Sequence, residues 1–269
     1  VVVVGGGAAG IFASIAAARE GAAVLCLEGG ASLLRKVRIS GGGRCNVMHD
    51  SATWDPRGAR DLLKARYPRG ATQLVGPLSS RFSPLETKAW FEAEGVTLKR
   101  ESDGRVFPST DDSATIIDAL LSAADRAGVQ LRTRVKVASA VRRDGGGFVV
   151  LGASGAEAGG GDGGPWTVET RSLLLATGSS SHHLAADLGH DILPLLPSLF
   201  SFRLSPGGML DASLAGVSVA DAELTLQLPP APASAGEGSA DSGSAPSPSK
   251  KRRRAGATNA LSARGPLLV

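Results

Sequence analysis

Three glycines and one carboxylate have the types and spacing best suited to chemistry. Gly5, Gly7 and Gly10 form a G-x-G-x-x-G pattern between an apolar run and an alanine-rich segment. Between a strand and a helix, Gly5 permits a tight turn, Gly7 lets the backbone approach a pyrophosphate, and Gly10 lets the helix pack on the strand. The helix N-terminus adds free N–H groups and a partial positive charge. The pattern therefore predicts a dinucleotide site.

The carboxylate is Glu28, which lies 18 residues after Gly10 at the end of a second apolar run. A carboxylate in this position accepts hydrogen bonds from ribose hydroxyls and disfavours a 2′-phosphate. A glycine turn that binds nothing is the alternative, and it leaves the combination of turn, helix and terminal acid unexplained. Both FAD and NAD satisfy these requirements, so this pattern alone does not choose between them.

A second glycine-rich stretch, residues 35–46, places three consecutive glycines among cationic and hydrogen-bonding side chains. Such a segment can wrap a long cofactor, and a cation beside a flavin ring would stabilise the anionic reduced form. We therefore favour FAD and take Arg44 as the candidate flavin-stabilising cation, while no catalytic acid or base can be named. From these residues alone, a solvated glycine-rich loop is an equally good interpretation.

The elements that must position these residues follow from the apolar pattern. Residues 1–4 and 23–27 are apolar runs typical of strands buried on both faces. Residues 11–20 between them have high helix propensity, and Gly21 is a natural stop. Together they predict a βαβ unit in a parallel sheet, with residues 1–4 central and the cofactor contacts at the carboxyl ends of the strands.

Further elements are expected downstream. Residues 83–86 have the composition of a capping box with Pro at the first helical position, so a helix should begin there and bury Leu85 and Trp90 on one face. The other helical patterns cover residues 54–67 and 113–127, and strand patterns cover residues 129–141, 148–151, 166–169, 171–176, 217–219 and 223–228.

Composition divides the chain into two parts. We expect an α/β, Rossmann-like FAD/NAD(P)-binding domain over residues 1–189 and the start of an inserted β-rich domain over residues 190–269. Residues 229–256, rich in Pro, Ala, Ser and Gly, are expected to be a disordered insertion. The basic run at residues 250–254 falls in it, and we interpret that run as a solvated loop rather than a nucleic-acid site.

Overall composition bounds the remaining functions. The formal net charge is +4, and two cysteines make no disulfide framework. We interpret the three histidines between residues 182 and 190 as structural or solvated, so no metal is expected. No apolar run reaches the roughly 20 residues that span a bilayer, which indicates a soluble protein. The chain opens at Val1 without an initiator Met, so we expect its N-terminus to be missing. Cytoplasm and plastid both stay open, as does the oligomeric state.

Four short motifs follow one another along the chain, at residues 4–10, 39–46, 104–108 and 176–178. In this order they resemble the BaiN/YhiN-like FAD-dependent oxidoreductases, also described as aminoacetone-oxidase-like or NAD(P)/FAD-dependent. The short segment at residues 179–183 and the stretch at 197–200 resemble a plant or cyanobacterial subgroup. In the family the chain returns to the FAD domain after the segment that begins near residue 265, so we expect this sequence to be truncated at its C-terminus.

The resemblance implies FAD in the glycine site and assigns the cofactor contacts. Glu28 would bind the adenosine ribose, the backbone of Val137 would hold the adenine, and the returning strand would contribute Thr177 and Gly178. The residues that would hold the pyrophosphate are Gly5, Gly7, Ala8, Ala9 and Gly10. Those that would run along the flavin side are Lys36, Ser40, Gly41, Gly42, Gly43, Arg44, Cys45 and Asn46.

The activity implied is hydride transfer through flavin N5 on an unknown small-molecule substrate. Since no second dinucleotide fingerprint is present, either NAD(P)H docks transiently over the flavin or an organic substrate reduces it directly. Two alternatives stay open. One is an FAD-binding protein of the tRNA-modification type, and the other is a truncated, non-catalytic remnant.

Overall fold

The computed structural model describes residues 1–49, 67, 70–152, 165–195, 218–227 and 260–268. They belong to two units, Val1–Pro194 and Leu195–Val269. The expected domain boundary at residue 189 stays a prediction. Almost all of the expected helix at residues 54–67 and the whole insertion at 229–256 lie outside the described residues. That the second unit is an inserted domain stays a prediction.

Four of the described strands form the parallel sheet at the centre of the first unit. Their order is β10 (Leu173–Leu175), β1 (Val2–Val4), β2 (Leu25–Leu27) and β6 (Gln130–Arg132). Val3 of β1 pairs with Leu174 on one side and Cys26 on the other. All of β1 is buried, as expected for a strand covered on both faces. The predicted α/β fold with residues 1–4 central is confirmed.

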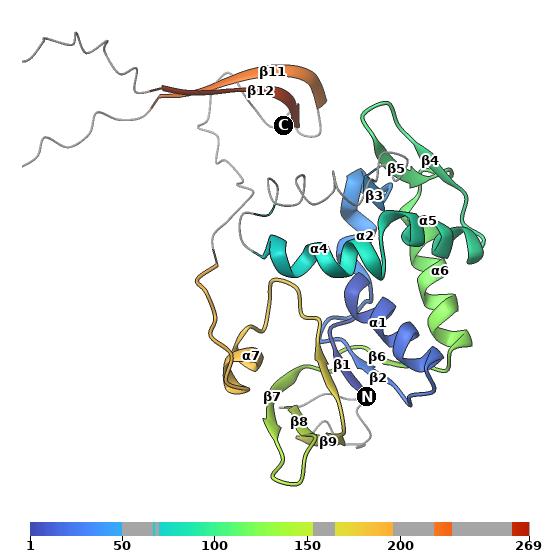
Figure 1. The fold of residues 1–269 in the computed structure, drawn as a ribbon, viewed down its shortest axis with the longest axis vertical. Helices are drawn as coiled ribbons and strands as arrows, with labels where there is room; N and C mark the ends of the chain where they lie inside the picture. The colour runs from blue at the N-terminus through green and yellow to red at the C-terminus, as the bar shows by residue number, and fades with distance from the viewer. Residues whose placement is uncertain (50–66, 68–69, 153–164, 196–217, 228–259, 269) are drawn as a thin grey trace, which may run out of the picture. The chain divides into compact units, whose positions relative to one another are not determined.

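Helices cover one face of this sheet. Figure 1 shows α1 (Ala8–Arg19) and α6 (Ser113–Arg126) side by side there, and the two helices are in contact. Ile11 and Ile15 of α1 are fully buried and join Val3 in the larger apolar core. Asp112 caps α6 by accepting a hydrogen bond from the Ala114 amide at 2.8 Å.

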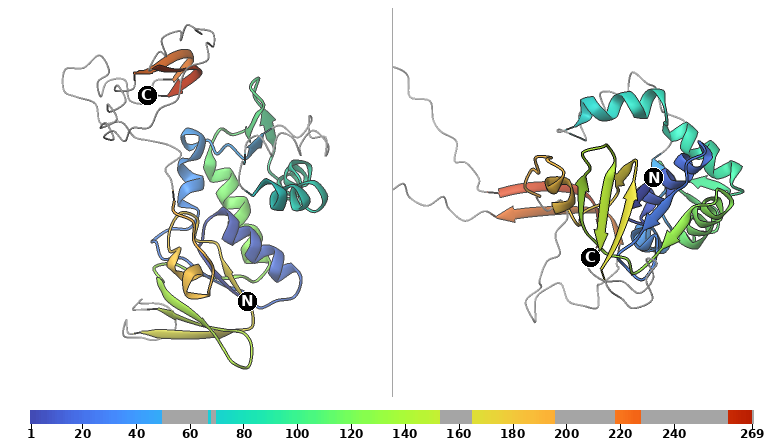
Figure 2. Two further views of the ribbon diagram at one scale, coloured as in Figure 1. Left: turned by 60° about the vertical axis from the view of Figure 1, so that its left-hand side comes forward. Right: turned by 90° about the horizontal axis from the view of Figure 1, so that it is seen from below.

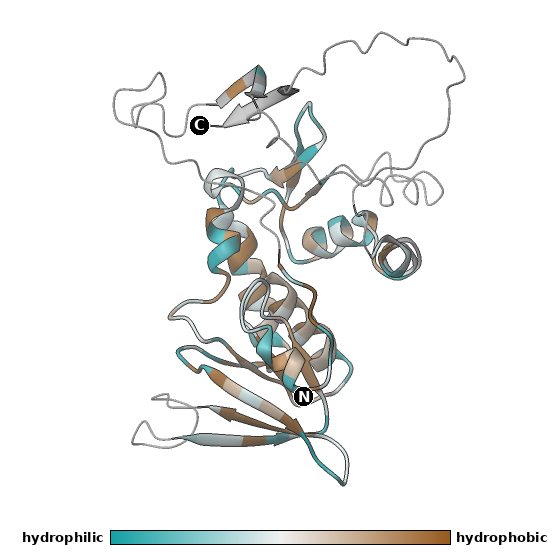
Figure 3. Ribbon diagram, turned by 90° about the vertical axis from the view of Figure 1, so that its left-hand side faces the viewer, coloured by the Kyte–Doolittle hydropathy of each residue, from teal (hydrophilic) through white to brown (hydrophobic). Residues whose placement is uncertain are grey.

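The opposite face packs against an antiparallel sheet of β7 (Val137–Arg142), β8 (Phe148–Gly152) and β9 (Trp166–Thr170) (Figure 2). Val2 and Val4 belong to this second core, because neighbouring side chains of a strand point to opposite faces. In Figure 3 the strands of the antiparallel sheet carry the brown, hydrophobic segments expected of this packing.

One predicted strand was wrong in its extent. Residues 129–141 form two strands, β6 in the parallel sheet and β7 in the antiparallel one. Arg134, between them, has a left-handed φ of +57°, which ends the extended run and turns the chain from one layer to the other.

A small antiparallel sheet of β3 (Met48–His49), β5 (Arg105–Pro108) and β4 (Leu98–Arg100) follows the glycine-rich stretch. The same region contains α2 (Arg35–Ile39), the 3₁₀ turn η1 (Ser40–Gly43), α4 (Ala71–Ser80) and α5 (Pro84–Ala93), and α7 (His183–Asp187) follows β10. The predicted capping box is present at Ser83 and Glu86. The predicted buried face of α5 is partly wrong, since Leu85 is 49% exposed and Phe91 is buried.

The second unit contains an antiparallel pair, β11 (Ser218–Gln227) and β12 (Ala260–Leu268). The described parts of the two strand patterns expected at residues 217–219 and 223–228 both belong to β11, which has an irregular register between Val219 and Ala222. Across the pair Arg264 donates to Asp221 at 2.9 Å. Within the ranges that the structure describes, no helix has both the length and the hydropathy needed to cross a membrane.

Candidate functional site

The glycine bend joins β1 to α1 through two very close backbone approaches. Gly5 has a φ of +112°, and a Cβ there would lie 2.4 Å from the carbonyl oxygen of Ala176, the residue that follows β10. A Cβ on Gly10 would lie 1.8 Å from the Gly5 carbonyl oxygen. Neither position can accept a side chain without moving backbone, so both glycines are required by the approach of the helix to the strand.

Gly7 differs from these two, because the space in front of it is open. It is the N-cap of α1, makes no side-chain capping hydrogen bond, and no atom lies within 4 Å of where its Cβ would be. The amides of the first helical turn, at Ala8, Ala9 and Gly10, have no acceptor within the helix. They lie at the positive end of the helix dipole, which is a ready site for an anion such as a pyrophosphate.

Glu28 holds the bend from the other side. Its Oε2 accepts a hydrogen bond from the Gly6 amide and its Oε1 accepts one from the Gly30 amide, both at 2.7 Å. The carboxylate thus ties the glycine bend to the turn after β2, a structural role that the sequence pattern did not reveal. Each oxygen keeps a further lone pair, so the carboxylate can still accept from a ribose hydroxyl.

A cavity of about 610 Å³ brings predicted residues from four separate segments together. Gly5, Glu28, Val137 and Thr177 all line it. His183 also lines it and was missed, because the sequence analysis weighed the histidines only as metal ligands; its Nε2 lies 3.2 Å from the Ala138 carbonyl oxygen. The volume falls within the range of about 300–1,000 Å³ typical of small-molecule sites.

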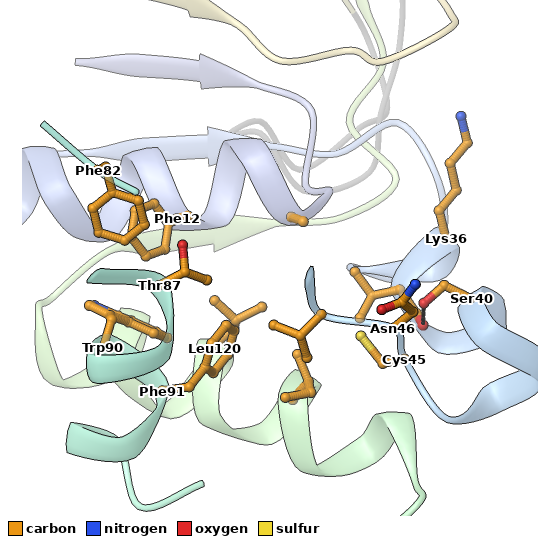
Figure 4. Close-up of a pocket in the computed structure, with 14 residues that line it drawn as sticks. Phe12, Lys36, Ser40, Cys45, Asn46, Phe82, Thr87, Trp90, Phe91 and Leu120 are labelled. Carbon is orange, nitrogen blue, oxygen red and sulfur yellow. Dashed lines mark hydrogen bonds between the residues drawn. The ribbon is translucent and has the colours of Figure 1, made fainter. Parts of the chain in front are cut away.

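A second cavity of about 370 Å³ lies among α1, α5, α6 and the segment from α2 to residue 47. Figure 4 shows its wall. The predicted residues that line it are Ala8, Lys36, Ser40, Cys45 and Asn46, and the rest are Phe12, Val37, Val47, Phe82, Thr87, Trp90, Phe91, Ile116 and Leu120. Its aromatic end was missed, because the spacing of Trp90 on a helix is equally typical of core packing.

The backbone of residues 41–45 explains the run of glycines. Gly41, Gly42 and Gly43 have φ values of +57°, +70° and +87°, in the left-handed region that favours glycine. Cys45 adopts the same region with a φ of +61° and is buried. Burial raises the pKa of the Cys45 thiol, which favours its protonated form, and burial raises the pKa of Cys26 to about 11.

Lys36 connects the two cavities. Its stem lines the smaller one, while its Nζ donates to the Ser179 hydroxyl at 2.8 Å, next to Thr177 of the larger one. In Figure 4 the ammonium points away from the aromatic residues. A Cβ on Gly178 would lie 3.8 Å from this ammonium, so the chain passes close to the cation at this turn.

Arg44 is engaged by two carboxylates. Its Nε donates to Asp111 at 2.8 Å, its terminal nitrogen pairs with Glu101, and its guanidinium carbon lies 4.1 Å from the ring centroid of Phe107. The guanidinium therefore anchors the glycine-rich segment to β5 and to the start of α6. Its predicted support of a reduced flavin stays a prediction.

Fold and site together define a class. A βαβ unit with a glycine bend, an acid closing the second strand, and helices and an antiparallel sheet on opposite faces make a Rossmann-like fold of the FAD/NAD(P)-binding class. Residues 1–224 match the family model described as the HI0933-like protein Rossmann domain, and the chain belongs to this family. The family is one of FAD-binding flavoprotein oxidoreductases.

Two curated relatives are named for different activities. The chain is 29% identical over 222 residues to a 3-dehydro-bile acid delta(4,6)-reductase of Clostridium scindens, covering 75% of this chain and 47% of the relative. It is 28% identical over 230 residues to a ribosomal RNA dihydrouridine synthase of Escherichia coli, covering 81% and 52%. The chain thus spans about half the length of the curated relatives it matches.

Among solved structures, the chain is similar to the 3-ketosteroid-delta4-(5alpha)-dehydrogenase of Rhodococcus jostii RHA1, solved with 4-androstene-3,17-dione. The TM-score is 0.51 at 20% identity, over 66% of this chain and 45% of that one. This likeness concerns the fold.

The geometry of the glycine bend predicts opposite outcomes for two equal substitutions. Gly10→Ala places a methyl group against the Gly5 carbonyl and should prevent α1 from packing, with loss of soluble, folded protein. Gly7→Ala meets open space and should leave the fold intact while weakening binding of an anion at α1. Thermal melting and FAD titration of both variants measure this. A stably folded Gly10→Ala chain would contradict the packing argument.

The anchor at Arg44 predicts a pH-dependent contribution to stability. Lys99 and Arg44 together hold the pKa of Asp111 below its ordinary value. Ionised Asp111 therefore contributes its full share to the stability of the fold above about pH 4, the ordinary pKa range of an aspartate. That share is lost as pH falls through the lower pKa that Asp111 has in the folded chain. Asp111→Asn should lower the melting temperature at pH 7 but not at acid pH.

Asp125→Asn, on the exposed side of α6, is the matched control and should leave melting unchanged at both pH values. Equal melting of Asp111→Asn and the unaltered chain at pH 7 would show that the anchor contributes nothing.

Proposed function

We propose that this chain binds FAD and forms the cofactor-binding part of a flavin-dependent oxidoreductase. The observation that carries the proposal is the convergence of Gly5, the Glu28 carboxylate and Val137 on one cavity, with the uncapped first turn of α1 following directly after the glycine bend. An anion site, a ribose acceptor and a strand-end backbone are the parts that hold an ADP group.

The residues present fit the cofactor. Open space at Gly7 allows a pyrophosphate to approach the amides of Ala8 and Ala9. The Lys36 ammonium, beside the turn at Thr177 and Gly178, adds positive charge near the same edge of the sheet. A 610 Å³ cavity gives room for the adenosine.

FAD, when bound, supplies hydride transfer at flavin N5. The chain's own residues bind and orient it: the first turn of α1 offsets the phosphate charge, and Glu28 accepts from the ribose. Residues 40–46, held by the Arg44 anchor, present backbone and the Asn46 amide toward the flavin side. The reductant is either NAD(P)H, docking transiently, or the organic substrate itself. Membership of the plant or cyanobacterial subgroup stays a prediction.

The first test is cofactor loading. Purified chain incubated with FAD should be yellow and retain flavin through desalting. Glu28→Gln should weaken FAD binding about tenfold, the scale of one charge-assisted hydrogen bond. Glu20→Gln, an exposed acid beyond the end of α1, is the control and should bind as the unaltered chain does. A well-folded chain that stays colourless and takes up no FAD would overturn the proposal.

A second candidate function is modification of RNA, because one relative is named a ribosomal RNA dihydrouridine synthase. The basic run at residues 250–254, which lies outside the described residues, would serve such a substrate. Replacing its five cations with Ser should then abolish RNA retention in a filter-binding assay and leave FAD content unchanged. We expect instead that both chains bind RNA equally weakly, consistent with a small-molecule substrate.

A further inference from the structure

The glycine bend between β1 and α1 is bounded by a chain segment on each side. On one side, the Leu34 amide at the start of α2 donates to the Gly6 carbonyl at 2.8 Å. On the other, the turn after β10 lies so close that a Cβ on Gly5 would be 3.2 Å from the Cα of Thr177. The space in front of Gly7 stays open. A group that binds at Gly7 therefore has α2 and this turn as its neighbours.

Lys36 joins these two segments. It lies two residues after Leu34, and its Nζ donates at 2.8 Å to the hydroxyl of Ser179, two residues after Thr177. Its stem lines the smaller cavity together with Ala8 of the first turn of α1. The side chain is extended, and its ammonium is directed away from the aromatic residues (Figure 4). A positive charge is thus held beside the glycine bend.

This ammonium differs from the neighbouring cations in what it is bound to. Among the residues that the structure describes, its hydrogen-bond partner is the neutral Ser179 hydroxyl, and no carboxylate pairs with it. Arg44 is already shared between two carboxylates. Lys136 lines the larger cavity beside the turn after β2, at the end assigned to the adenosine. Lys36 therefore keeps its charge available for an anion at the bend.

The helix alone does not balance the charge of a bound diphosphate. The first turn of α1 offers a partial positive charge of about half an elementary charge. Each phosphate of a dinucleotide carries a full negative charge, so most of that charge is left unbalanced. An ammonium has more N–H donors than the one that Ser179 uses, and a charge-assisted hydrogen bond to a phosphate oxygen is stronger than one to a hydroxyl.

We propose that Lys36 is the cation that binds the diphosphate of the cofactor, and that Ser179 is a positioning residue that holds its ammonium beside the glycine bend before the cofactor arrives. The proposal rests on the proposed function, because it concerns the same FAD site. It moves Lys36 from the flavin side, where the family resemblance puts it, to the phosphates at the middle of the cofactor.

Calorimetric titration of the full chain with ADP and with FAD tests this, since ADP carries the diphosphate without the flavin. Lys36→Met should weaken both ligands by about tenfold or more. Lys36→Arg keeps the charge and should bind both within about threefold of the unaltered chain. Arg35→Met removes the same charge from the adjacent, exposed position of α2 and should leave both affinities unchanged.

The role of Ser179 has its own test. Ser179→Ala should weaken ADP binding by about threefold, and Ser179→Thr, which restores a hydroxyl, should recover it. In the Lys36→Met background, Ser179→Ala should cause no further loss, because the hydroxyl acts through the ammonium. The same loss with and without Lys36 would overturn the positioning role.

The two ligands separate the possible positions of the ammonium. If Lys36→Met weakens FAD but leaves ADP unchanged, the ammonium binds the flavin side and the proposal is overturned. Unchanged binding of both ligands overturns it as well, and so does an equal loss in Arg35→Met, which would indicate a general effect of charge. If Lys36→Met melts at a lower temperature than the unaltered chain, Lys36→Gln replaces it and the same criteria apply.

Failure of the proposed function gives a different pattern. A chain that takes up no FAD but binds ADP, with the same loss in Lys36→Met, would keep Lys36 as a diphosphate-binding residue and remove the flavin assignment. A chain that takes up FAD equally well with and without the Lys36 ammonium would remove only the role of Lys36. A chain that binds neither nucleotide would overturn both.

Discussion

The contact between α1 and β1 is the constraint on which the site depends. Gly10 lies so close to the Gly5 carbonyl that a single methyl group would separate helix and strand. This approach brings the uncapped end of α1 to the edge of the parallel sheet, where the Glu28 carboxylate binds the amides of Gly6 and Gly30. The proposed anion site and the proposed ribose acceptor therefore lie together only because no side chain intervenes.

The glycine-rich segment after β2, residues 35–46, forms another wall of the candidate site. Three consecutive left-handed glycines would be a poorly determined backbone if nothing held them. Arg44 holds them through Asp111 and Glu101 and by lying over Phe107, and Lys36 reaches across to Ser179. One segment thus borders the aromatic cavity and also links it to the cavity lined by Glu28.

Sequence reasoning succeeded where the signal was local. The βαβ unit and the capping box at Ser83 were predictable because their residues are neighbours in the chain. Prediction failed for residues 129–141, where an uninterrupted apolar alternation hides a change of sheet at Arg134. It also misjudged Leu85, since helical spacing limits which residues share a face but not which face meets a neighbour.

The sequence by itself determined the strand–glycine–helix unit, the position of its acid and the class of cofactor such a unit accepts, because these depend on backbone geometry over short distances. Only the tertiary structure decided that Val137, Thr177 and His183 meet Glu28, and that Phe12 and Trp90 enclose a cavity beside Asn46. The same holds for the carboxylate partners of Arg44. Contacts of this kind join segments far apart in the chain, and many alternative pairings have nearly equal local energies until the core is packed.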